Sequence, residues 1–230
     1  MAFRPTFDLF FFSYIYEAYL QTNQVPGEGS VMSKILTSLN NTVIAGFVLA
    51  ILLFILYSAS GEGYSGVDFG VFFFRWLHVL SGVMWIGLLW YFNFVQIPNM
   101  AKIPDEQKPA IGKVIAPAAL FWFRWAAMAT IVTGLIVSYM NGYGREAMML
   151  GLTDGVAKHT MIGIGMWLGI IMWANVWFVI WPNQKRALGM VECTAEEKAA
   201  SARTAMLFSR TNTLLSIPML FAMVSAQNLF

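Results

Sequence analysis

The sequence of 230 residues contains five long apolar runs, and this feature constrains its fold more than any other. The runs cover residues 36–58, 71–97, 115–140, 157–181 and 205–226. As a helix, each run can cross the ~30 Å hydrocarbon core of a bilayer, which takes about 20 residues. Only 11% of the residues are charged, whereas a soluble domain has about 25%. The sequence therefore predicts an all-α fold, a polytopic membrane bundle of about five transmembrane helices.

The first 35 residues have a different pattern, because aromatic side chains there are interrupted by polar ones. Asp8 and Glu17 break the apolar stretch and no small-residue cleavage site follows, so a signal peptide is not indicated. An aromatic, half-polar helix suits the membrane interface. We therefore expect an N-terminal interfacial segment at 1–35 and a five-helix membrane domain at 36–230.

Lysine and arginine are distributed unevenly between the two sides of the predicted bundle. Because these residues collect in cytoplasmic loops, the richer side is predicted to be cytoplasmic, with the N-terminus inside and the C-terminus outside. No basic stripe is long enough to indicate a nucleic-acid partner. The richer side holds Arg4, Lys34, Lys102, Lys108, Lys113, Lys185, Arg186, Lys198 and Arg203, and the other side holds Arg75, Arg145 and Lys158.

The second and fourth apolar runs share the pattern Trp-x-Gly-x5-Asn without a gap. It reads "WIGLLWYFN" from Trp85 and "WLGIIMWAN" from Trp167. Together with the helix that follows each run, this pattern indicates an internal two-helix repeat. One extra residue separates His159 from Trp167, and one residue rotates a helix face by about 100°. The two copies are therefore not expected to be exact.

The two histidines of the chain, His78 and His159, lie near the outer ends of these same two runs. An ionisable side chain in a bilayer is costly, so it indicates a function and a partner. No Asp or Glu lies deep inside the five runs, which leaves a metal, a haem, a carbonyl or water. Because histidine is a common axial ligand of haem iron, the leading hypothesis is a bis-histidine haem b with both rings as metal ligands.

Residues near each histidine fit a haem-binding role. Gly82 and Gly163 follow the histidines by four residues, on the same helix face, and leave room for a flat macrocycle. Arg75 and Lys158 are placed to neutralise the haem propionates. Trp85 is a candidate for the wall of the pocket.

Two observations limit these assignments. Cys193 is the only cysteine, so the chain has no CxxCH site for a covalent c-type haem. A histidine near a helix end can also lie among lipid headgroups and simply bond to a carbonyl, and His159 beside Lys158 fits that role as well. The sequence leaves both interpretations of His159 open.

A second polar set lies in the predicted cytoplasmic half. It consists of Asn93, Arg124, Asn175, Arg210 and Asn212. Asn93 and Asn175 occupy matching positions of the repeat, where they could form interhelical hydrogen bonds worth about 0.6 kcal/mol each. The alternative is a small polar cavity for an anionic or amide-rich substrate.

Several segments resemble a known family. They are "RWLHVLSGVMWIGLLWYFNFVQIPN", "WFRWAAM", "HTMIGIGMWLGIIMWANVWFVIWPNQK" and "SRTNTLLSIPMLFAM". Across residues 70–226 they are similar to the membrane domain of the bacterial PuuD-type urate oxidase (urate hydroxylase) family. The resemblance implies a link to purine breakdown in the bacterial inner membrane, where the C-terminus predicted from the Lys and Arg distribution would lie in the periplasm. Family members carry a cytochrome c domain after the membrane part, and this sequence ends at Phe230 without one.

Two functions follow as expectations. In the first, the chain is a haem b protein that passes electrons to an external acceptor such as a separate cytochrome c, in connection with urate or purine oxidation. In the second, it is a non-catalytic accessory subunit of a larger membrane complex, surrounded by lipid and without a cofactor. The sequence leaves open whether the chain is an oxidoreductase or an electron-transfer subunit.

Overall fold

The computed structural model describes residues 31–59 and 66–230 of the chain. All regular structure in those ranges is helical, and five helices there are long and apolar enough to cross a membrane. This confirms the predicted all-α membrane bundle. The predicted interfacial segment at 1–35 falls mostly on residues outside the described ranges and stays a prediction. The chain divides into two compact units, Met1–Tyr64 and Ser65–Phe230.

The first unit contributes the helices α2 (Val31–Leu36) and α3 (Leu39–Ala59). The span Leu39–Leu56 within α3 has a mean hydropathy of 2.3. The corner between α2 and α3 is held by side chains, because the Thr42 hydroxyl donates to the Ile35 carbonyl at 2.9 Å. The Asn41 amide also donates to the Lys34 carbonyl at 3.2 Å.

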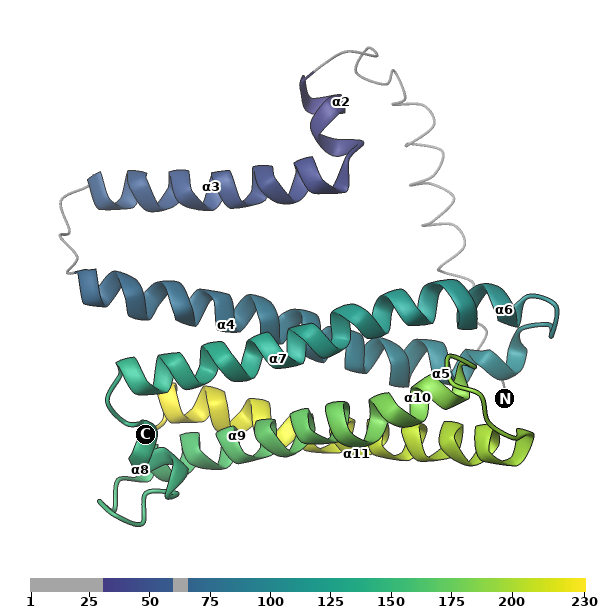
Figure 1. Ribbon diagram of the computed structural model, residues 1–230. Coiled ribbons are helices and arrows are strands. Elements are labelled where there is room, and N and C mark those ends of the chain that lie inside the picture. The colour runs from purple at the N-terminus through teal and green to yellow at the C-terminus, as the bar shows by residue number, and fades with distance from the viewer. Residues whose placement is uncertain (1–30, 60–65) are drawn as a thin grey trace, which may run out of the picture. The chain divides into compact units, whose positions relative to one another are not determined.

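The second unit is built from four long helical rods, drawn from blue to yellow in Figure 1. Short α8 (Gly144–Met148) lies in the connection between the second and third rods. The first rod consists of α4 (Gly66–Trp90), η1 (Tyr91–Gln96), α5 (Ile97–Asn99) and η2 (Met100–Lys102), and the second of α6 (Lys108–Ala110), η3 (Ile111–Ile115) and α7 (Ala116–Met140). The third rod consists of α9 (Ala157–Ala174), η4 (Asn175–Ile180) and α10 (Trp181–Ala187). The fourth rod is α11 (Ala195–Asn228).

These rods pack as two antiparallel pairs. Helix α4 packs along α7, and α9 packs along α11. The pairs meet where α7 contacts α9 and where α11 contacts α4. Each pair therefore contains one copy of the Trp-x-Gly-x5-Asn pattern, on α4 and on α9.

Three turns of π-helix, η1, η3 and η4, interrupt the rods, and each ends two residues before a proline. Proline lacks an N–H and its ring collides with the carbonyl four residues earlier. The preceding residue instead donates to the carbonyl five residues earlier, which widens the helix by a π turn. The pairs are Ile97 to Phe92, Ala116 to Ile111 and Trp181 to Val176, before Pro98, Pro117 and Pro182. Both copies of the Trp-x-Gly-x5-Asn pattern thus lead into the same irregularity.

The tightest packing lies in the middle of this unit and toward the end away from α8. Large side chains from three rods are almost wholly buried there. They include Trp85, Leu89, Leu120, Phe123, Met172 and Ile180. The half nearest α8 contains a cavity instead.

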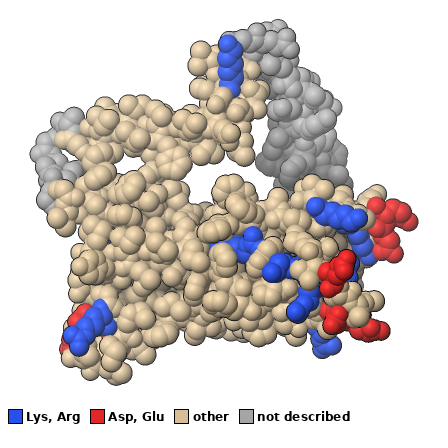
Figure 2. Space-filling view, viewed as in Figure 1, with Lys and Arg blue, Asp and Glu red and all other residues tan. Residues whose placement is uncertain are grey.

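Charged side chains in this unit concentrate at the end away from α8 (Figure 2). They lie around the connections between α5 and α6 and between α10 and α11, and a smaller group lies near α8, which contains Arg145 and Glu146. In the first connection Lys108 contacts Asp105 at 2.6 Å, and the hydrogen bond from Lys108 holds the pKa of Asp105 below its ordinary value.

Candidate functional site

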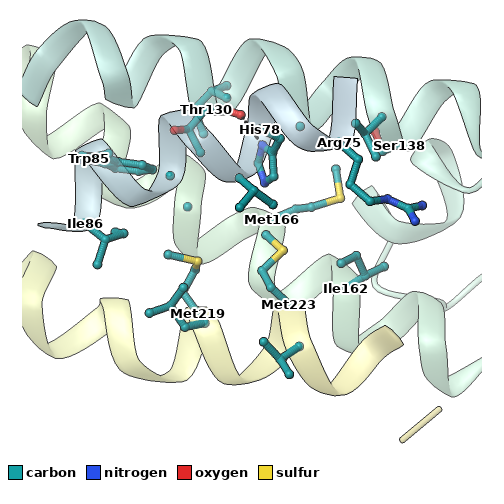
Figure 3. Close-up of a pocket in the computed structure, with 18 of the residues that line it drawn as sticks. Arg75, His78, Trp85, Ile86, Thr130, Ser138, Ile162, Met166, Met219 and Met223 are labelled. Carbon is teal, nitrogen blue, oxygen red and sulfur yellow. Dashed lines mark hydrogen bonds between the residues drawn. The ribbon is translucent and has the colours of Figure 1, made fainter. Parts of the chain in front are cut away.

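A cavity of about 690 Å³ lies between α4, α7, α9 and α11. Its volume is in the range of cofactor and ligand pockets, about 300–1,000 Å³. Its wall is mostly apolar, with Met166, Met219 and Met223 facing the middle of the space in Figure 3. Because so few polar groups line it, each of them has a strong influence on what the cavity can bind.

His78 contributes an imidazole ring to this wall. Its Nδ1 lies 2.9 Å from the carbonyl oxygen of Thr130 and 3.3 Å from the hydroxyl oxygen of Thr133, both on α7. A carbonyl oxygen can only accept, so Nδ1 carries the proton, and in the neutral ring Nε2 is an acceptor. Nε2 has no hydrogen-bond partner among the described residues. A histidine held to a carbonyl in this way is the usual arrangement of a metal ligand.

Two glycines make room around the ring. A Cβ on Gly134 of α7 would lie 2.8 Å from Cε1 of His78, so only glycine allows the ring to lie there. A Cβ on Gly82, one turn along α4, would meet no atom within 4 Å, because Gly82 lines the cavity. Thr130, Gly134 and Ser138 recur every four residues on one face of α7, and this signal could have identified the wall from sequence.

The two ends of the cavity carry different polar groups. Arg75 lies at the end near Ser138 (Figure 3), and its guanidinium donates to the Asn141 side chain at 3.4 Å. Trp85, two turns beyond His78 on α4, is 1% exposed, and its indole Nε1 has no hydrogen-bond partner among the described residues. The cavity therefore has a cation at one end and an unpaired donor in its wall near the other.

His159 does not line this cavity. Its Nδ1 is hydrogen-bonded to the carboxylate of Asp154, and its ring stacks on Tyr143 with centroids 6.0 Å apart. The hydrogen bond from His159 holds the pKa of Asp154 below its ordinary value. Burial raises the pKa of Tyr143, which lies in the cavity wall. His159 thus has a local partner in the connection before α9.

The other residues predicted around His159 also lie outside the cavity wall. Lys158 does not line it, and neither does Gly163. A Cβ on Gly163 would collide with the carbonyl oxygen of Ala147, so this glycine allows α8 to approach α9 closely. The structure therefore brings Arg75, Gly82 and Trp85 together with His78, and places Lys158, His159 and Gly163 elsewhere. Ligation of a haem by either histidine stays a prediction.

The asparagines of the second polar set form interhelical hydrogen bonds. Asn93 donates to the Ser209 hydroxyl at 2.8 Å, and Asn175 donates to the side-chain oxygen of Asn212 at 2.8 Å. Asn212 is 0% exposed and donates in turn to the Met172 carbonyl at 2.9 Å. Both asparagines therefore connect their helices to α11.

The two arginines of that set have different surroundings. The Arg124 guanidinium lies over the Trp181 ring, with Cζ 3.3 Å from the ring centroid, and Arg210 is exposed on α11. None of the five residues of the set lines the large cavity. The set is thus divided between interhelical bonds and the arginine sites rather than gathered into one pocket.

The fold and the cavity together define a polytopic helical membrane protein with an apolar internal site. Comparison with known families sharpens this assignment, because the model of the urate oxidase N-terminal family matches residues 146–229. The resemblance to the membrane domain of urate oxidase is thus confirmed from α8 to α11, whereas α4 and α7 lie outside the match. No curated protein and no solved structure matches the chain.

Proposed function

We propose that this urate-oxidase-type membrane protein binds haem b in the cavity through His78 and passes electrons to an external acceptor. The observation that carries the proposal is the geometry of the His78 ring. Its Nδ1 is held by the Thr130 carbonyl, its Nε2 has no hydrogen-bond partner among the described residues, and the ring lines an apolar cavity of about 690 Å³. A bound haem would supply a one-electron redox couple. The acceptor is a separate protein such as a cytochrome c, and the electron source is an oxidation of the urate or purine class.

The remaining residues of the cavity fit such a group. Arg75 supplies a cation at the end of the cavity near Ser138, where it can pair with a carboxylate substituent. The methionine and aliphatic wall makes the surroundings of a bound group apolar, which strengthens electrostatic interactions there. The Thr130 carbonyl fixes the tautomer and the orientation of His78.

The concentration of Lys and Arg at the end away from α8 supports the predicted orientation in the inner membrane. In that orientation the cavity lies in the periplasmic half of the bilayer. Arg75 is then at the periplasmic end of the cavity, which is the side where an external acceptor would dock.

The test is an optical spectrum of the purified chain in a mild detergent, oxidised and then reduced with dithionite, with haem counted by pyridine haemochrome. A sharp reduced α-band in the wild type that is lost in His78→Ala is the expected result. A colourless wild type, without haem and without metal by elemental analysis, would overturn the proposal. That outcome favours the accessory-subunit hypothesis, and the next step is then to identify the proteins that bind the chain.

A further inference from the structure

Arg124 is a cation in a membrane-spanning helix without an anionic partner. It lies within the span Lys108–Met140 and forms no ion pair with a carboxylate of the described residues. Its Nε and Nη1 are buried and have no hydrogen-bond acceptor in the described part of the chain. A charged group within a span indicates a site whose partner remains to be named.

The groups around Arg124 come from the other helix pair. Its Cζ lies 3.3 Å from the ring centroid of Trp181 and 6.0 Å from that of Trp177. The Nζ of Lys185 lies 5.7 Å from the same Trp181 ring. Two cations thus share one aromatic ring, and cation–π attraction partly replaces the hydration that they lose. It does not neutralise their charge.

The depth of this cluster is that of a bilayer interface. Arg124 lies 16 residues before the end of α7 at Met140, and a hydrocarbon core takes about 20 residues of helix. The guanidinium is therefore about one turn inside the far boundary, and Trp181 and Lys185 continue outward from it along α10. Lys185 therefore extends from this depth toward the interface, where lipid phosphates lie.

The side chains beside the cluster on its outer surface are apolar. Trp125 is 49% exposed and Phe178 is 70% exposed, and Trp125 packs edge-on against Trp177 at 5.5 Å. A free inorganic anion would make no favourable contact with these apolar side chains, whereas the acyl chains of a phospholipid would pack against them. Arg124 is itself partly exposed, so a headgroup can reach it.

We propose that Arg124, Trp181 and Lys185 form a binding site for the headgroup of an anionic phospholipid, between α7 and α10. The phosphate would accept hydrogen bonds from the Arg124 guanidinium, and Lys185 would add the second positive charge that favours an anionic lipid over a zwitterionic one. This site is independent of the cavity and of any cofactor, since it lies at the opposite end of the bundle.

The test counts bound phosphatidylglycerol and phosphatidylcholine on the intact chain by native mass spectrometry after detergent exchange. The wild type is expected to retain phosphatidylglycerol in preference to phosphatidylcholine. In Arg124→Gln the retained phosphatidylglycerol should fall about five-fold, the effect of ~1 kcal/mol for one basic residue at the membrane surface. Phosphatidylglycerol retention should also decrease in Lys185→Gln. This variant tests the same site if Arg124→Gln does not fold.

Arg210→Gln is the matched control. Arg210 lies 18 residues before the end of α11 at Asn228, which is a similar depth, but it is exposed. Its substitution should leave phosphatidylglycerol retention unchanged. Equal losses in Arg124→Gln and Arg210→Gln would overturn the proposal, because they would show only a general effect of charge. Displacement of the lipid by inorganic phosphate at low concentration would also overturn it, in favour of a free-anion site.

Discussion

The α4–α7 and α9–α11 pairs carry the same sequence pattern but use it differently. Both continue from Trp-x-Gly-x5-Asn into a π turn before a proline. In the first pair, His78 faces the cavity and is held by the neighbouring helix. In the second, His159 lies outside the cavity wall and bonds to Asp154 in the preceding loop.

The physical difference is one residue of helix. His78 precedes Trp85 by seven residues, which is almost two full turns, and both side chains line the cavity. His159 precedes Trp167 by eight residues, so its ring is turned by about a further 100° relative to the tryptophan. Trp167 is 40% exposed and donates to the Met148 carbonyl instead of entering the cavity wall. The comparison teaches that a repeated motif does not make a repeated site.

The largest expected difference between the two helix pairs is measured by removing each histidine separately. His78→Ala should lower haem content at least about tenfold, because it removes the imidazole that lines the cavity wall with a free Nε2. His159→Ala should retain the haem, since the His159 ring lies outside the cavity wall and is hydrogen-bonded to Asp154. The measurement is the pyridine haemochrome of both variants at matched protein concentration. Equal loss in the two variants would restore the bis-histidine hypothesis.

The second prediction compares the two glycines that follow the histidines. Gly163→Ala should lower the free energy of unfolding by about 3 kcal/mol, because the new Cβ meets the backbone carbonyl of Ala147, which cannot rotate away. Gly82→Ala should be neutral or slightly stabilising, as its Cβ enters open space within a helix. Denaturant unfolding in detergent micelles measures both. Similar losses would show that Gly82 is also a close-packing position.

The third prediction concerns the side-chain hydrogen bonds that connect the rods of α4 and α9 to α11. Asn212→Ala should lower the free energy of unfolding by about 1.5 kcal/mol, since it leaves the side-chain amide of Asn175 without its acceptor and removes one donor to the carbonyl of Met172. Asn93→Ala removes one bond to Ser209 and should cost about 0.6 kcal/mol. The same unfolding assay applies. An effect of Asn93→Ala larger than that of Asn212→Ala would contradict this ranking.

The smallest expected effect is the pH dependence of the His159 contact. Because the hydrogen bond lowers the pKa of Asp154 in the folded chain, its stabilisation is present above the ordinary aspartate pKa of 3.8 and is lost as the pH falls through the lower folded value. Thermal unfolding of the wild type and of Asp154→Asn should therefore differ at neutral pH and converge in acid. A difference that persists in strong acid would show that the carboxylate charge is not responsible.

Much of the fold follows from the sequence. The predicted run at 115–140 corresponds to α7 at Ala116–Met140, and the run at 36–58 corresponds to α3 at Leu39–Ala59. The run at 71–97 is shorter than the continuous rod Gly66–Lys102, because the residues at the two ends of that rod include Asp68, Pro98 and Lys102 and carry no strong apolar signal. The role of Asn93 and Asn175 in interhelical bonds was one of two alternatives that the residues left open.

The cavity wall was harder to predict. Arg75, His78, Gly82 and Trp85 lie on one face of α4, and their spacing is enough to group them. Thr130 and Gly134 belong to another helix, and they contact His78 only because α7 packs along α4. The collision of a Gly163 side chain with Ala147 depends on short α8, which no apolar pattern indicates.

By itself the sequence determined that this chain forms membrane-spanning helices, that five of them lie in the described residues, and that both histidines lie near one end of their helices. These are properties of hydrophobic length and local order, which each segment carries on its own. The tertiary structure alone decided which histidine faces the cavity, because that depends on the rotation of each helix against its neighbours. It also decided that Arg124 meets the Trp181 ring of another helix pair. Helix packing fixes such contacts between residues far apart in the chain, and no local pattern records them.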